Sequence, residues 1–164
     1  MGERILFFDV DGVLNVNCRQ LDPRAIEQLK RLLRVTRARI VLSSDWRLWP
    51  KFKEQLRLQF IAQGLPEWVD ETPVLARHES RPWEIWLWLR RNSADNWAAV
   101  DDMPLLRQSG GSFLAGRFVR TDATQGLTLD AADKLIAILK PQRSAVHKTK
   151  SWKTPAAADM SSPT

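Results

Sequence analysis

The sequence of 164 residues has one cysteine, two histidines and no tyrosine. The lone Cys18 cannot form an intramolecular disulfide, and so few cysteines and histidines cannot build a structural zinc cage. No apolar run approaches the roughly 20 residues that a helix needs to span a bilayer. The early apolar run at residues 5–8 is followed at once by Asp9, which argues against a signal peptide. These absences exclude disulfide-rich, zinc-stapled and membrane-spanning classes and predict a cytoplasmic location.

Half of the net positive charge lies near the C-terminus. Apolar residues make up 44% of the chain and charged residues 27%, as in ordinary globular domains, and the net charge is +6. Residues 141–164 carry half of this excess and are rich in Ala, Ser, Pro and Thr without any period. The composition predicts one domain over residues 1–140 and a disordered basic tail over 141–164. Such a tail is either a solubilising end or a salt-sensitive contact for nucleic acid.

Strand and helix patterns alternate along residues 4–140. Short apolar runs predict buried strands at residues 4–10, 38–42, 96–100 and 116–120. Helical spacing and capping residues predict helices at residues 23–35, 50–64, 83–92 and from Thr128 onward, with a loop at 65–80. This order favours an α/β fold with an open parallel sheet and helices on both faces.

Acidic and hydroxyl side chains directly follow three of the predicted strands. They are Asp9 and Asp11, then Ser43 and Ser44, then Asp101 and Asp102. In an open parallel sheet the ligand site lies beyond the carboxyl ends of the strands, so we expect these groups to converge. Crowded carboxylates repel unless a cation compensates, and Mg²⁺ prefers such oxygen ligands. Since an aspartate can also attack phosphate, the pattern predicts Mg²⁺-assisted phosphoryl chemistry.

The motifs that carry this pattern resemble those of the haloacid dehalogenase (HAD) superfamily. FFDVDGVLN is similar to the first motif, IVLSSDWR to the second and AVDDM to the fourth. Together with RPWEIWLWL and TDATQGLT, they resemble the small HAD domains of Swiss Army Knife RNA-repair proteins over about residues 4–140. The resemblance implies a HAD-like Rossmannoid fold and a phosphatase that hydrolyses phosphoric monoesters.

The resemblance also implies a role for each motif residue. Asp9 would be the nucleophile that forms an aspartyl-phosphate, and Asp11 would protonate the leaving group and then activate water. The implied Mg²⁺ ligands are Asp9, the main-chain carbonyl of Asp11, and Asp101 or Asp102. Ser43 would hydrogen-bond the phosphoryl group, with Ser44 as the alternative. A second acid at the position of Asp11 separates HAD phosphatases from dehalogenases, so a phosphatase is favoured.

The third HAD motif is a single basic residue ahead of the third strand, and Arg81 is the predicted residue. Pro82 is a first-turn residue, so Arg81 is predicted to occupy the cap of the helix. A cation there opposes the helix dipole, and a broken local rule often marks a functional site. Arg77 is the alternative in the preceding loop.

Trp46 and Arg47 directly follow the two serines. Arg47 is predicted to bind a substrate phosphate because its planar guanidinium matches two oxygens. Trp46 either stacks on a base or packs. Only about ten residues separate Asp11 from the first helix, so a large cap domain is excluded.

The predicted function is therefore a Mg²⁺-dependent phosphomonoesterase acting on nucleotide or polynucleotide (RNA or DNA) ends, which suit an uncapped site. The alternatives are a small-metabolite HAD phosphatase and a non-catalytic HAD-like interaction domain, although Asp9 and Asp11 argue against the latter. A response-regulator receiver also gathers acids around Mg²⁺, but its adjacent acids come on the first strand. Here the adjacent pair comes on the third.

Overall fold

The computed structural model describes residues 3–16, 20–75 and 80–140, which contain a five-stranded parallel sheet. The strand order is β3-β2-β1-β4-β5. The strands are β1 (Arg4–Phe8), β2 (Arg39–Leu42), β3 (Asp70–Glu71), β4 (Asn96–Asp101) and β5 (Phe118–Arg120). The helices are α1 (Pro23–Thr36), α2 (Pro50–Ala62), α3 (Arg81–Arg91) and α4 (Leu129–Leu139). The predicted open α/β fold is confirmed, while the predicted tail at 141–164 lies outside the described residues.

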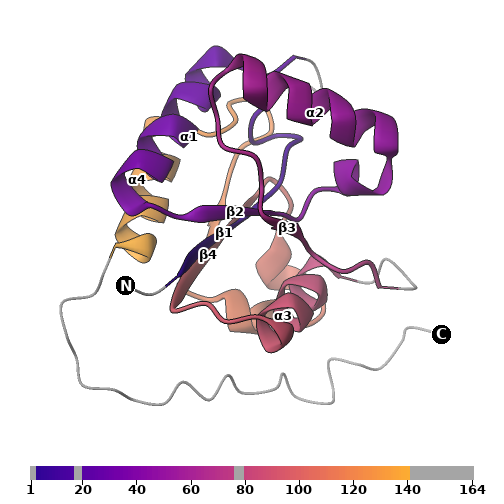
Figure 1. Ribbon diagram of the computed structural model, residues 1–164. Helices are drawn as coiled ribbons and strands as arrows, with labels where there is room; N and C mark the ends of the chain where they lie inside the picture. Colours follow the sequence, from indigo (N-terminus) through magenta and orange to yellow (C-terminus); the bar gives the residue numbers. More distant parts are fainter. Residues whose placement is uncertain (1–2, 17–19, 76–79, 141–164) are drawn as a thin grey trace.

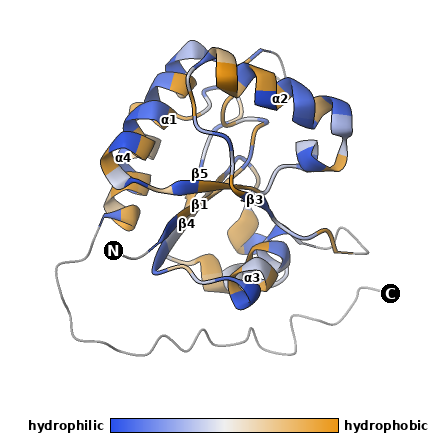
Figure 2. Ribbon diagram, viewed as in Figure 1, coloured by the Kyte–Doolittle hydropathy of each residue, from blue (hydrophilic) through white to orange (hydrophobic). Residues whose placement is uncertain are grey.

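Helices cover both faces of the sheet (Figure 1). α1, α2 and α4 pack on one face, and α3 packs on the other with two short 3-10 turns, η2 (Leu105–Arg107) and η3 (Gly111–Leu114). Because successive side chains of a strand point to opposite faces, Leu6 and Phe8 of β1 enter one core while Ile5 and Phe7 enter the other. Figure 2 shows the hydrophobic sheet enclosed between helices with hydrophilic outer faces.

Local signals explain where most of the helices begin. The side chain of Asp22 accepts a hydrogen bond from the Arg24 N–H at the start of α1, and Thr128 caps α4 in the same way. α2 begins at Pro50 and buries Leu56 and Phe60, but two other large apolar residues of this helix are exposed, Phe52 at 47% and Ile61 at 59%. α2 lies at the β2–β3 side of the sheet, so the sheet covers only a narrow stripe of it (Figure 1).

One prediction about the 65–81 region, the cap of α3, is wrong. α3 is capped by Ser80, whose side chain accepts from the Trp83 N–H, so Arg81 is the first helical residue and not the cap. A serine oxygen can accept from the helix N-terminus and a guanidinium cannot, which is why the cap lies one residue earlier. The loop also contains the two-residue edge strand β3. Within the described ranges, no helix is long and apolar enough to cross a membrane.

Candidate active site

The central strand β1 brings the three predicted strand ends together. Phe8 pairs with Leu42 of β2 on one side and with Val100 of β4 on the other. The next residue, Asp9, therefore lies beside Ser43 and Asp101, the residues that follow these partners. The Asp9 N–H donates to the Val100 carbonyl at 3.1 Å, which continues the ladder to this point. The juxtaposition expected from parallel strands is thus present.

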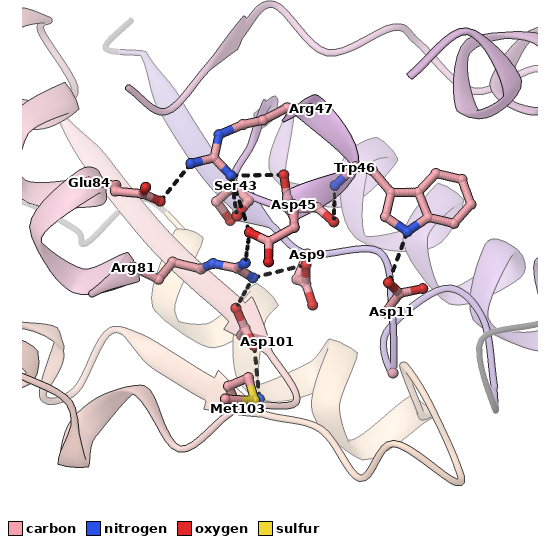
Figure 3. Close-up of polar contacts among 12 residues, drawn as sticks. Asp9, Asp11, Ser43, Asp45, Trp46, Arg47, Arg81, Glu84, Asp101 and Met103 are labelled. Atoms are coloured by element: carbon pink, nitrogen blue, oxygen red, sulfur yellow. Dashed lines mark hydrogen bonds and ion pairs between the residues drawn. The ribbon is translucent and has the colours of Figure 1, made fainter. Parts of the chain in front are cut away.

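Arg81 lies at the centre of this acidic rim (Figure 3). Its Nη1 is 2.9 Å from Oδ1 of Asp9 and 2.7 Å from Oδ2 of Asp101, and its Nη2 is 2.8 Å from Oδ1 of Asp45. Burial alone would lower the pKa of Arg81, but the three carboxylates outweigh it and raise that pKa above its usual range. The guanidinium therefore stays charged at every working pH. Asp45 directly follows Ser43 and Ser44, so the sequence places it at the same end of the sheet, but it gives no role to this residue.

Burial dominates the titration of the two carboxylates at the floor of the site. Burial raises the pKa of Asp9 to about 7, and the neighbouring Asp101 adds to the rise, while Arg81 and a hydrogen bond from the Ser44 hydroxyl oppose it. Burial also raises the pKa of Asp101, against Arg81 and the Met103 N–H, which donates to Asp101 Oδ1 at 2.8 Å. One guanidinium is therefore too little positive charge for the pair, and an added cation would stabilise their ionised forms.

Asp9, Asp101 and Asp102 have the donor chemistry of a site for a hard cation. One carboxylate oxygen from each lies within 4.8 Å of the other two. Gly12 makes room for this arrangement, because a Cβ there would come within 2.6 Å of the Asp102 carboxylate, and its φ of +67° favours glycine. All three donors are oxygens, as Mg²⁺ prefers, so the residues present fit the predicted ion.

Asp11 is held apart from this cluster and turns toward Trp46 (Figure 3). The Trp46 Nε1–H donates to Asp11 Oδ2 at 2.9 Å, and the Asn15 amide donates to Oδ1 at 2.7 Å. Asn15 is fully buried, and its own Oδ1 accepts from the Gly12 N–H at 3.1 Å. Two donors from different segments thus fix the second aspartate of the motif. Asn15 was missed, although it closes the DVDGVLN motif.

A comparison with known protein families identifies the family of this chain. The family described as HAD domain in Swiss Army Knife RNA repair proteins matches the chain over residues 5–132. The chain belongs to this family. Comparisons with curated proteins and with solved structures found no match. The family places the protein among the hydrolases of the HAD superfamily, and the matched span includes every residue of the acidic rim.

The late motif of this HAD domain supports the first-motif loop. The Thr121 hydroxyl donates to the Gly12 carbonyl at 2.7 Å, and the Leu127 N–H donates to the Val13 carbonyl at 2.8 Å. Asp122 shapes the intervening turn by accepting hydrogen bonds from the backbone N–H and the hydroxyl of Thr124. Hydrogen bonds from the TDATQGLT segment therefore fix the loop that carries Asp11.

The two serines of the HAD domain differ in what they contact. The Ser44 side chain lowers the pKa of the Asp9 carboxyl, and its oxygen accepts from the Trp46 N–H at 3.3 Å. Ser43 is buried directly beside Asp9 in the sheet register. The assignment of the phosphoryl contact to Ser43 stays a prediction, with Ser44 as the alternative.

Arg47 lies behind the serines with its side chain only 2% exposed. Its Nε donates to the Thr72 carbonyl at 3.0 Å, its Nη1 to the Ser44 carbonyl at 2.8 Å and its Nη2 to Oε2 of Glu84 at 2.7 Å. Phosphate binding by Arg47 stays a prediction, but these partners use its donors to join the second motif to α3. Glu84, which lies in RPWEIWLWL, was missed as the partner.

Replacing Arg47 with alanine is expected to destabilise the domain by about 3–5 kcal/mol, because it leaves the buried Glu84 carboxylate without its cation. Urea unfolding followed by circular dichroism measures the loss. Arg57→Ala is the control, since Arg57 forms an exposed ion pair with Glu54 on α2 and is expected to change stability little. A loss in Arg47→Ala no larger than in the control would contradict the buried-pair argument.

Proposed function

We propose that this HAD domain is a Mg²⁺-dependent phosphomonoesterase that acts on nucleotide or polynucleotide ends through an aspartyl-phosphate on Asp9. The observation that carries the proposal is that the two aspartates of the first motif, Asp9 and Asp11, have different partners. Asp9 is paired with the permanently charged Arg81, whereas Asp11 is held separately by Trp46 and Asn15. A nucleophile beside a cation and an independently held acid are the two groups that such a reaction needs.

The reaction has two steps. A carboxylate oxygen of Asp9 attacks phosphorus, the ester P–O bond breaks, and protonated Asp11 gives its proton to the leaving oxygen. Water then attacks the phosphorus of the aspartyl-phosphate while ionised Asp11 takes its proton, which releases inorganic phosphate and restores both residues. Asp9, Asp101 and Asp102 would hold Mg²⁺, which when bound would neutralise their charge and polarise the phosphoryl oxygens.

Arg81 and Ser44 serve the same transfer from the protein side. The Arg81 guanidinium, bridging Asp9 and Asp101, can donate to phosphoryl oxygens as negative charge builds on them. The Ser44 hydroxyl orients the Asp9 carboxylate by donating to it. Both groups are fixed before substrate arrives, so little reorganisation is needed during the reaction.

Access and charge support a nucleotide or polynucleotide substrate. The connection between β1, which ends at Phe8, and α1, which begins at Pro23, is too short to carry a separate cap domain over the site. The net charge of +6 favours polyanionic partners, and the matching family is described by RNA repair. A small-metabolite phosphatase is the second candidate, because the same residues would serve any phosphate monoester.

A phosphate-release screen tests the proposal. The purified protein is incubated with Mg²⁺ and, in parallel, p-nitrophenyl phosphate, nucleoside monophosphates and oligonucleotides ending in a 3′ or 5′ phosphate. We expect release from the nucleotides and oligonucleotides that stops on chelation. Release from none of the substrates in the presence of Mg²⁺ would contradict the proposal. A sugar phosphate is included in the same screen, and release from it but not from the nucleotides or oligonucleotides would favour the small-metabolite alternative.

Trp46→Phe is expected to lower kcat/KM on a nucleoside monophosphate about tenfold and to leave kcat/KM on p-nitrophenyl phosphate nearly unchanged. This ratio reports the steps up to formation of the aspartyl-phosphate, before Asp11 acts as a base toward water. The substitution keeps a ring but removes the N–H that donates to Asp11. An alkoxide needs a proton to leave, whereas nitrophenolate leaves without one, so only the first substrate senses a misplaced acid. Trp49→Phe is the control, since Trp49 is 60% exposed. Equal losses on both substrates would contradict this role for Trp46.

A further inference from the structure

A cleft of about 870 Å³ opens beside Asp11, between the start of α1 and the start of α2. Residues that line it include Asp11, Gln20, Leu21, Trp46, Phe52 and Gln55. The volume lies within the range of sites for small organic molecules. Asp11, the side chain that would protonate the leaving group, borders the cleft, so a leaving group whose oxygen lies at Asp11 would extend into it.

The wall of the cleft carries an exposed aromatic ring with a defined neighbour. Phe52, in the first turn of α2, is 47% exposed, and its ring centroid lies 5.4 Å from that of Trp46 at an interplanar angle of 38°. Trp46 is itself fixed by its hydrogen bond to Asp11. Single exposed apolar residues are common on protein surfaces, but this one faces a cleft that ends at the acid. Its uncovered face can stack with a flat ring.

The polar groups of the cleft favour a neutral occupant. The amides of Gln20 and Gln55 offer both donors and acceptors, and the charged residues in the lining are the acids Asp11 and Asp22. The described lining contains no lysine or arginine. Phosphates are therefore drawn to Arg81 on the other side of Asp9, while the cleft suits a heterocycle with hydrogen-bonding edges.

We propose that this cleft binds the nucleobase of the leaving nucleoside, stacked on Phe52 beside Trp46, with the phosphorylated hydroxyl at Asp11. The inference rests on the proposed phosphatase function and deepens it, because it makes Phe52 a specificity-determining residue. It selects a nucleoside over an aliphatic alcohol as the leaving group. Phe52 belongs to none of the groups that carry out phosphoryl transfer, so its removal affects recognition and not chemistry.

The test compares Phe52→Ala with wild type on two kinds of substrate. For adenosine 3′- or 5′-monophosphate, KM is expected to rise on the order of tenfold, the size of one lost stacking contact, with kcat nearly unchanged. For glycerol phosphate, which has no ring, both constants are expected to stay within about twofold. Phe52→Tyr keeps a ring and should behave like wild type, whereas Phe52→Leu keeps apolar volume and should behave like Phe52→Ala. The control is Ile61→Ala, on the same helix, 59% exposed and outside the cleft lining.

A second measurement separates this inference from the phosphatase proposal. Binding of adenosine, which carries no phosphate, is measured by equilibrium dialysis with wild type and Phe52→Ala, and ribose serves as the ringless comparison. Weaker adenosine binding in Phe52→Ala supports the cleft even if no substrate is hydrolysed, a result that would sink the phosphatase proposal alone. Equal KM changes on both substrates, or no change in KM and in adenosine binding, would overturn the cleft while hydrolysis stood.

Discussion

Asp9→Asn is expected to bring phosphate release down to background while circular dichroism stays unchanged. An amide is a poor nucleophile, so no aspartyl-phosphate can form. Asp9 follows the last residue of the central strand, and its side chain lies at the meeting point of Arg81 and Asp101. Asp130→Asn, on the exposed first turn of α4, is the control and should retain full activity. Wild-type-like release in Asp9→Asn would rule out the covalent mechanism.

The stability of the same variant is expected to depend on pH in a specific direction. Burial raises the pKa of Asp9 to about 7 from its ordinary value of 3.8, which applies to the unfolded chain. Between these values the folded state binds more protons, so the stability that Asp9 contributes is full below pH 4 and falls as pH rises through 7. Asparagine does not titrate. Without metal, Asp9→Asn should therefore melt higher than wild type at pH 8, and this advantage should shrink toward pH 4.

Thermal melting with and without metal checks this expectation. Wild type should gain more from added Mg²⁺ than Asp9→Asn does, because the variant lacks one of the three clustered carboxylates. A metal-free Asp9→Asn protein that melted lower than wild type by the same amount at every pH would contradict the electrostatic account of the site.

Arg81→Ala is expected to reduce kcat by about 10²–10³, the range for one lost donor that stabilises transition-state charge in a shielded site. The substitution should also lower the melting temperature of the metal-free protein at neutral pH, because it leaves Asp9 and Asp101 buried without a cation. Both carboxyls have raised pKa values, so they take up protons as pH falls, and the stability difference should narrow in acid. Arg81→Lys should recover part of both properties.

The control for Arg81 is Arg24→Ala, which removes an exposed guanidinium at the start of α1. It should change neither kcat nor its pH profile. If Arg81→Ala kept the wild-type kcat, the third-motif role would pass to another basic residue, with Arg77 next in line, although that residue lies outside the described part of the chain.

The parts of the fold that follow local rules could be predicted from the sequence. Asp22 and Thr128 indicate the starts of α1 and α4 because their side-chain oxygens accept hydrogen bonds from N–H groups of the first helical turn. Asp9 lies close to Asp101 because β1 and β4 pair in parallel, and the carboxyl ends of parallel strands lie at the same edge of the sheet. β3 gave no signal because two charged residues at an edge have neither period nor apolar content.

The sequence does not predict which charged residues form ion pairs between distant segments of the chain. Arg81 reaches Asp45, and Arg47 reaches Glu84, across separations of 36 and 37 residues. Such pairs depend on where helix α3 settles against the sheet, and no local pattern specifies that. The sequence predicts the cap of α3 one residue too late because Pro82 suits the second helical position as well as the first.

The central position of β1 also has a consequence for synthesis of the chain on the ribosome. β1 emerges first, yet one of its two neighbours in the sheet, β4, begins only at Asn96. Asp101 at the end of β4 and Thr121, which holds the Gly12 carbonyl, emerge later still. Throughout most of translation the nascent chain exposes Asp9 without a finished site around it. The cluster of Asp9, Asp101 and Arg81 thus forms only near the end of the domain's synthesis, and a chain stalled before β4 cannot assemble it.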